Sequence, residues 1–149
     1  MTSQHSKDLT QVAQDIIEAF NTDDWARFKA PLAPNVVYEE SGTQRRVQGA
    51  DAYVQVTKEW KQAFPDAKGT IRNSLSSGNA VVQEVLWEGT QTGAFPTASG
   101  TLPPSGRRVM VPAIVWLTFQ GDQIHEVHHH IDVMGMMQQL GVMSTPSGG

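Results

Sequence analysis

The chain of 149 residues has no cysteine, no long apolar run and little charge. Without cysteine there are no disulfides, no thiolate metal ligands and no cysteine nucleophile. No apolar stretch approaches the roughly 20 residues that a membrane-spanning helix needs. Charged residues make up only 17%, the formal net charge is -4, and no basic run marks a nucleic-acid binder. We therefore expect a cytoplasmic protein with neither nucleic acid nor membrane as its partner.

Apolar residues make up 39% of the chain, which is enough for one sizeable core. We predict a single domain over residues 8–143. The polar segments 1–7 and 144–149 are expected to be a flexible N-terminus and a flexible C-terminal tail. Segment 1–7 has no apolar signal-peptide core.

Helical periodicity dominates the first half of the chain. Apolar residues recur every three to four positions in 8–20 and again in 50–64, which predicts two helices with one buried face each. A short helix carrying Trp25 and Phe28 is expected between them and ends before Pro31.

Two short strands, 36–40 and 45–48, are expected to pair as a hairpin before the helix over 50–64. This pairing places Glu40 opposite Arg45, and Glu39 opposite Arg46. We interpret both as exposed cross-strand charge pairs, which contribute little to stability.

After residue 68 the apolar period becomes strand-like. Four strands are predicted over 69–76, 79–89, 107–119 and 123–133. The Gly- and Pro-rich segment 89–106 is predicted to be a functional flap or an irregular loop. Helices followed by strands indicate an α+β fold, in which helices cover the concave face of a curved antiparallel sheet and leave a cone-shaped hollow for a ligand.

The last strand carries the side chains best suited to acid/base chemistry. With a two-residue turn at Gly121-Asp122, strand alternation places three titratable groups on one face, amid apolar neighbours on the preceding strand. These groups are His128, His130 and Asp132, and the neighbours are Val111, Ala113 and Val115. The opposite face, which includes His129, Ile131 and Trp116, is apolar enough to predict a homodimer interface through the sheet.

The residues alone leave three interpretations of Asp132. It directly precedes an expected helix that ends at Gly141, so it suits a helix N-cap. It can join His128 and His130 as a metal ligand. It can also act as a general acid and base.

The segment 129–141 (HHIDVMGMMQQLG) resembles the C-terminal signature of the SnoaL-like polyketide cyclases. That signature has a His or aromatic residue, one further residue, an Asp, and a short helix ending in Gln-Leu-Gly. Segments 89–95 and 103–109 also resemble the long hairpin of this family, and the order of elements agrees over roughly 8–141. The resemblance implies a cone-shaped α+β barrel of the nuclear transport factor 2-like (cystatin-like) type, and homo-oligomers built through the sheet.

For the activity, the resemblance implies an intramolecular aldol ring closure without metal or cofactor, with Asp132 at the position of the catalytic Asp. We expect a lyase or isomerase that takes an apolar, polyketide-like carbonyl substrate. Asp132 would move the proton, supported by His130 or His128. The expected substrate-binding residues are Tyr38, Trp60, Trp87, Val111, Ala113 and Val115. The alternatives are a non-catalytic binding or accessory protein, and a metal-dependent enzyme using His128, His130 and Asp132.

Overall fold

The computed structural model describes residues 8–97 and 100–142. The two segments expected to be flexible, 1–7 and 144–149, lie outside the described residues. The described residues form four helices, α1 (Leu9–Asn21), α2 (Trp25–Lys29), α3 (Ala50–Ala63) and α4 (Val133–Leu140). The three early helices agree with the expected ones to within one or two residues. In the described part of the chain, no helix is long and apolar enough to cross a membrane.

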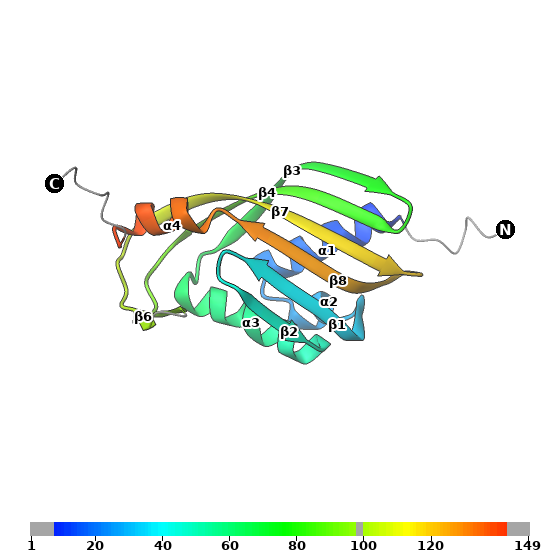
Figure 1. Ribbon diagram of the computed structural model, residues 1–149, viewed down its shortest axis with the longest axis horizontal. Helices are drawn as coiled ribbons and strands as arrows, with labels where there is room; N and C mark the ends of the chain where they lie inside the picture. The colour runs from blue at the N-terminus through cyan, green and yellow to red at the C-terminus, as the bar shows by residue number, and fades with distance from the viewer. Residues whose placement is uncertain (1–7, 98–99, 143–149) are drawn as a thin grey trace.

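The strands form one large sheet and one small hairpin (Figure 1). The large sheet has the order β2-β1-β8-β7-β4-β3, and only the pair β1–β8 is parallel. This confirms a mostly antiparallel sheet. Its strands are β1 (Leu32–Ser41), β2 (Arg45–Gln48), β3 (Lys68–Ser77), β4 (Ala80–Thr90), β7 (Arg108–Gln120) and β8 (Gln123–Ile131); β5 (Phe95–Thr97) and β6 (Gly100–Leu102) form the small hairpin.

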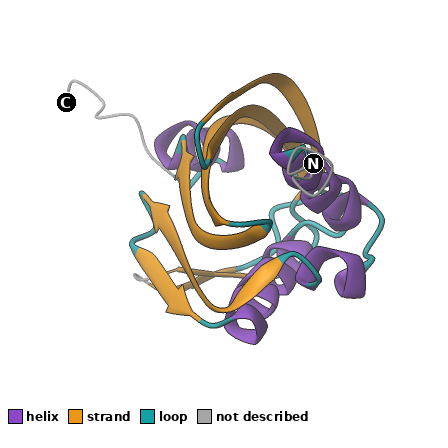
Figure 2. Cartoon of the chain, turned by 90° about the vertical axis from the view of Figure 1, so that its right-hand side faces the viewer, coloured by secondary structure: helices purple, strands orange, loops and turns teal. Residues whose placement is uncertain are grey.

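The large sheet curves around its helices, as Figure 2 shows, and the expected α+β architecture is confirmed. Helix α1 packs against β3 and β4, and α3 packs against β1 and β2. The core lies between these layers because the inward positions are apolar: Ile16, Phe20, Val81, Leu117 and Phe119 are all almost fully buried.

The segment predicted to be a flap contains the hairpin β5–β6. Phe95 at its start is buried, and its ring centroid lies 4.9 Å from that of Trp60 on α3. The backbone N–H of Gly93 donates to the carbonyl oxygen of Ala63, and a side chain at Gly93 would collide with the α3 backbone at Gln62. This stretch of the segment is therefore packed onto α3.

The register of β8 on β7 differs from the expected one because β8 contains a bulge. Phe119 pairs with Ile124 as expected, but Thr118 pairs with Glu126, so His125 has no partner on β7. One extra residue reverses which face every later side chain occupies. Beyond the bulge, His129 therefore points into the fold, while His128 and His130 point outward.

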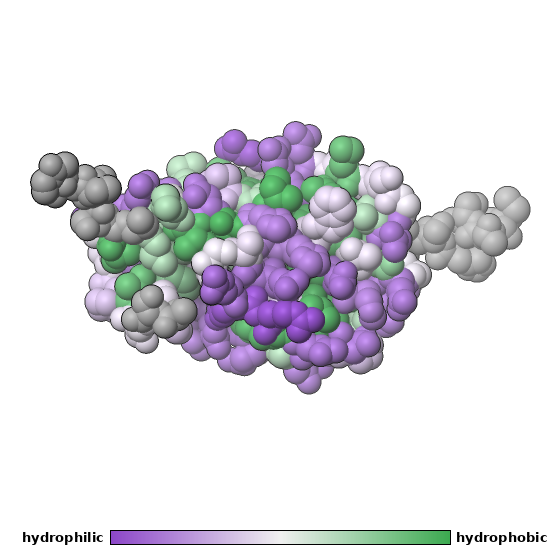
Figure 3. Space-filling view, in the orientation of Figure 1, coloured by the Kyte–Doolittle hydropathy of each residue, from purple (hydrophilic) through white to green (hydrophobic). Residues whose placement is uncertain are grey.

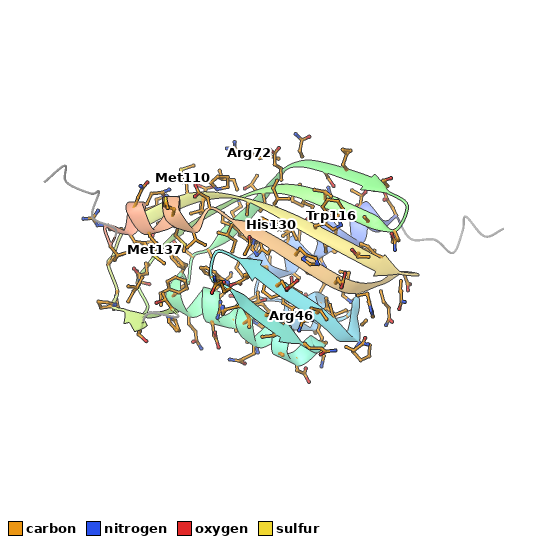
Figure 4. The ribbon with its side chains drawn as sticks, viewed as in Figure 1. Arg46, Arg72, Met110, Trp116, His130 and Met137 are labelled. Carbon is orange, nitrogen blue, oxygen red and sulfur yellow. The ribbon has the colours of Figure 1, made fainter. Side chains whose placement is uncertain are left out.

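This reversal also corrects the expected homodimer interface. His129 is buried and so does not belong to a flat apolar outer face, and Ile131 is half-buried between the internal cavity and a shallow outer depression. Trp116 does point outward beside His130 (Figure 4), and 46% of its surface is exposed. The space-filling view shows apolar side chains on this face interrupted by hydrophilic ones (Figure 3). A homodimer through the sheet stays a prediction.

Candidate active site

A cavity of about 90 Å³ lies between the concave face of the sheet and helices α1 and α3. Five of the six expected substrate-binding residues line it: Tyr38, Trp60, Trp87, Val111 and Val115. Ala113 does not; it is buried and borders a shallow depression on the outer face of the sheet. The cavity wall contains neither Lys nor Arg among the described residues, and its other members are mainly aliphatic and aromatic.

His129 is the imidazole that faces this cavity. Its Nδ1 lies 2.9 Å from the hydroxyl oxygen of Tyr38, and its Nε2 accepts a hydrogen bond of 3.1 Å from the indole N–H of Trp87. Because an indole nitrogen only donates, Nε2 must carry a lone pair, and in the neutral ring the proton is then on Nδ1. We infer that Nδ1–H donates to Tyr38, whose own hydroxyl is free to donate onward.

The proton of Tyr38 points to a buried carboxylate. Its hydroxyl donates to Oε2 of Glu40 over 2.6 Å, and the Trp60 indole N–H donates to the same oxygen over 2.6 Å. The other oxygen, Oε1, accepts from the Thr43 hydroxyl and from Nε of Arg45. Glu40 is only 2% exposed, so a continuous hydrogen-bonded path joins the cavity wall to a buried charge.

The expected pairing of Glu40 with Arg45 and of Glu39 with Arg46 is confirmed. The interpretation of both pairs as exposed is wrong for the first. The Glu40 side chain is fully buried and faces the core, whereas 40% of the Glu39 side chain is exposed. The difference follows from strand alternation, because neighbouring residues on β1 point to opposite faces.

The surroundings set the charge of each group in this path. Burial lowers the pKa of His129 to about 4, although the Glu40 carboxylate acts in the opposite direction. His129 is therefore neutral at pH 7. Burial alone would raise the pKa of Glu40, but hydrogen bonds from Tyr38 and Trp60 and the charge of Arg45 bring it below its usual value. Burial, followed by the Glu40 charge, raises the pKa of Tyr38 well above its usual value. The path thus holds a neutral base, a protonated phenol and a carboxylate.

The three residues expected to carry the chemistry lie elsewhere. Asp132 is exposed and caps α4, where its Oδ1 accepts from the backbone N–H of Gly135 over 3.0 Å. His130 is exposed and hydrogen-bonds to the Ser41 hydroxyl, and His128 lies beside Glu39. Asp132 and His130 border only the shallow outer depression. Their expected position inside the cavity is wrong because of the bulge at His125.

Nothing in the described part of the chain gathers three or more His, Cys, Asp or Glu side chains as a metal site would. His128 and His130 point to the outer face of β8, and Asp132 follows the strand as the cap of α4. The absence of a tightly bound metal stays a prediction, which metal analysis of the purified protein tests.

One further polar side chain lines the cavity. Gln83 on β4 is 1% exposed, and neither Oε1 nor Nε2 has a hydrogen-bond partner. A buried amide without partners costs about 1–3 kcal/mol per group. In the sheet ladder Gln83 pairs with Val115, which pairs with His129, so the two polar side chains share one row of the concave face.

Sequence reasoning missed His129, Glu40 and Gln83. A signal for His129 was present, because Ile124 and Val127 are both apolar yet three residues apart, which strict alternation does not allow for two inward positions. The odd-numbered apolar pair Val127 and Ile131 then indicates the inward set of β8 beyond the bulge. No comparable signal marks Gln83.

The comparisons with known proteins agree with this architecture. The model of the SnoaL-like polyketide cyclase family matches residues 10–140. The chain belongs to this family. No curated protein matches the sequence.

Several solved structures are similar to this chain over most of their own length. IdmH of Streptomyces antibioticus, provisionally named a polyketide cyclase, superposes with a TM-score of 0.78 at 22% identity, covering 91% of this chain and 100% of its own. AclR of Streptomyces galilaeus gives 0.78 at 20% identity, with 92% and 87% covered. An LEH-like epoxide hydrolase of M. tuberculosis gives 0.68 at 17% identity, with 89% and 88% covered. At these identities the likeness shows the fold alone.

Proposed function

We propose that this SnoaL-like protein is a cofactor-free enzyme that moves a proton at a carbon next to a carbonyl group, in an aldol ring closure or a related isomerisation or dehydration. The family supports a small-molecule enzyme, and the cavity wall suits an apolar substrate. One observation carries the proposal: the path from Trp87 through His129 and Tyr38 to Glu40.

In the proposed reaction, the C–H bond next to the carbonyl breaks and its proton goes to Nε2 of His129. The electron pair forms an enolate. In ring closure the enolate carbon attacks a second carbonyl, and the resulting alkoxide takes the proton from Nε2–H; in an isomerisation the enolate takes that proton back at another position. The Nδ1–H group of His129 keeps its hydrogen bond to the Tyr38 oxygen, and the Glu40 carboxylate offsets the positive charge that forms on the imidazole ring. His129 thus takes the role that the family resemblance gave to Asp132.

The substrate must displace one contact to reach His129. Nε2 accepts from Trp87 in the empty cavity, so the reacting C–H has to replace that indole N–H. Once released, the Trp87 N–H can donate to the enolate oxygen. A low pKa of about 4 makes His129 a modest base, so we expect a substrate whose proton is already activated by neighbouring carbonyls.

The hydrogen bonds that His129 already makes also favour a second function, ligand binding without turnover. Both ring nitrogens have partners within the protein, so a ligand can fill the cavity and leave them undisturbed. The difference between the two functions is whether a proton leaves the ligand.

Deuterium exchange at carbon separates them. In heavy water, an activated ketone such as 2-tetralone loses its proton NMR signal next to the carbonyl when the protein removes that proton. We expect His129→Gln to reduce the protein-catalysed rate by at least about 100-fold. His130→Gln is the matched control, with the same substitution one residue away on the outer face, and should leave the rate unchanged. Equal rates for His129→Gln and the unaltered protein would contradict the proposal, and binding without exchange supports the second function.

A further inference from the structure

Gln83 is a polar group that the proposed chemistry does not use. Its side chain lines the cavity beneath α1, and its neighbours on the concave face, Val81, Val85 and Val115, are buried and apolar. Its amide has one acceptor oxygen and a donor nitrogen, and both lack partners within the described protein. A second buried glutamine, Gln91, differs: its Nε2 donates to the carbonyl oxygens of Gly93 and Pro103, and only its Oε1 lacks a partner.

We propose that Gln83 is a recognition subsite for a hydroxyl group of a neutral substrate. An alcohol or phenol hydroxyl satisfies both orphaned atoms at once, because its oxygen accepts from Nε2 and its proton donates to Oε1. A carbonyl oxygen alone would satisfy only the nitrogen. This inference rests on the proposed function in taking the cavity as the substrate site and, for the orientation of the substrate alone, in taking His129 as the base.

The charges around the cavity are the reason that we expect a neutral ligand. Among the lining residues the structure describes, no Lys or Arg is present to balance a carboxylate or phosphate. Glu40, a carboxylate behind the wall, already has the counter-charge of Arg45, and Glu88 in the lining has that of Arg108, so neither arginine is free to pair with a ligand anion. An anion would therefore be desolvated without a partner.

The position of Gln83 also sets how far apart the polar groups of the substrate lie. Gln83 and His129 are separated by one strand, β7, so their backbones are about 10 Å apart and their side chains converge on the same hollow. The substrate then carries a hydroxyl at one end and its acidic C–H and carbonyl at the other, joined by an apolar body. The subsite would thus orient the substrate toward His129.

The test compares two probes that differ by one hydroxyl, p-cresol and toluene, by NMR titration of the full chain. We expect the unaltered protein to bind p-cresol about tenfold more tightly, since two hydrogen bonds to a buried amide are gained. Gln83→Met, which keeps the length and removes both polar atoms, should abolish this preference and leave toluene binding unchanged. Gln91→Met is the matched control and should keep the preference.

Thermal unfolding gives a second measurement. Gln83→Met removes two unsatisfied polar atoms and should keep or raise the melting temperature, whereas Gln91→Met breaks two hydrogen bonds and should lower it. Equal binding of the two probes by the unaltered protein, undetectable binding of p-cresol, or an unchanged preference in Gln83→Met would overturn the subsite.

The binding preference and the melting temperature are both measured without turnover. A preference that needs Gln83 in a protein without deuterium exchange would support the subsite and reject the enzyme. Exchange that needs His129 without any hydroxyl preference would do the reverse.

Discussion

Gly69 lies opposite Trp87 in the β3–β4 ladder, and the six-membered ring of the indole fills the space where a β-carbon would stand. A Cβ at position 69 would lie only 2.6 Å from Cζ3 of Trp87. Strand β3 is held in place at Gly69, because the Asn21 side chain on α1 accepts from the Gly69 N–H over 2.8 Å and donates to the Gly69 carbonyl oxygen over 2.9 Å. Gly69 therefore helps to determine where Trp87 meets His129.

We expect Gly69→Ala to push the indole away from His129 and to destabilise the protein by about 1–3 kcal/mol. Urea unfolding measures the free energy, and a change in tryptophan emission reports the displacement. Trp87→Phe removes the ring edge that the new methyl group meets, so Gly69→Ala should cost much less in that background. Additive costs in the double variant would show that the methyl group meets something other than Trp87.

A second prediction concerns the buried carboxylate. Glu40→Gln places an NH2 group where donors from Tyr38, Trp60, Thr43 and Arg45 converge, and it leaves the Arg45 side chain without its buried partner. We expect a loss of about 3 kcal/mol in the free energy of unfolding at pH 7.

The neighbouring residue provides the control for this substitution. Glu39→Gln makes the same change on the outer face, where Glu39 lies 3.6 Å from Arg46 with both side chains partly exposed. Such a pair contributes less than about 1 kcal/mol, so this variant should unfold nearly like the unaltered protein. Equal losses in the two variants would show that the burial of Glu40 is not what makes it important.

These two glutamates illustrate what the sequence could and could not predict. The hairpin pairs followed from turn length and strand spacing, and they were correct. Which pair is buried was not predicted, because that depends on β1 lying between β2 and β8, a contact between segments about 90 residues apart. The parallel pairing of β1 with β8 brings Glu40 beside His129 and so builds the path.

The error on β8 had a local cause. The inward set of β7, including Val111, Ala113 and Val115, was correct, because unbroken alternation determines it. On β8 a single bulged residue, His125, changed the face of every later side chain. The family resemblance then reinforced Asp132 at a position where the helix begins.

A third prediction follows from the low pKa of His129. Burial lowers it from 6.5 to about 4, so between these pH values the unfolded chain binds a proton at this residue that the folded chain does not. Stability from this residue is therefore complete above pH 6.5 and is lost as the pH falls toward 4. At 1.36 kcal/mol per pKa unit, the loss is about 3 kcal/mol.

Chemical unfolding at several pH values measures this loss. His129→Gln should remove it, so the difference in unfolding free energy from the unaltered protein should shrink as the pH falls from 7 to 4. The pKa of Glu40 is lowered by its hydrogen bonds and by Arg45, and Glu40 is present in both proteins, so its contribution largely cancels in this difference. His130→Gln serves as the exposed counterpart; because the charge of His130 is the smallest cause of the low His129 pKa, this variant should change the pH profile only slightly. A pH-independent difference for His129→Gln would show that the imidazole is not held neutral by burial.

The last prediction separates the cap of α4 from the catalytic role that the family resemblance implied for Asp132. Its side chain accepts from the Gly135 N–H at the start of the helix, and it points away from the cavity. Asn is an equally good N-cap, so Asp132→Asn should change neither stability nor the deuterium-exchange rate. Asp132→Ala should cost about 1 kcal/mol of stability while the exchange rate is retained. A fall of about 100-fold in the rate of Asp132→Asn, with normal melting, would restore Asp132 as the proton-transferring group and would require α4 to rearrange when substrate binds.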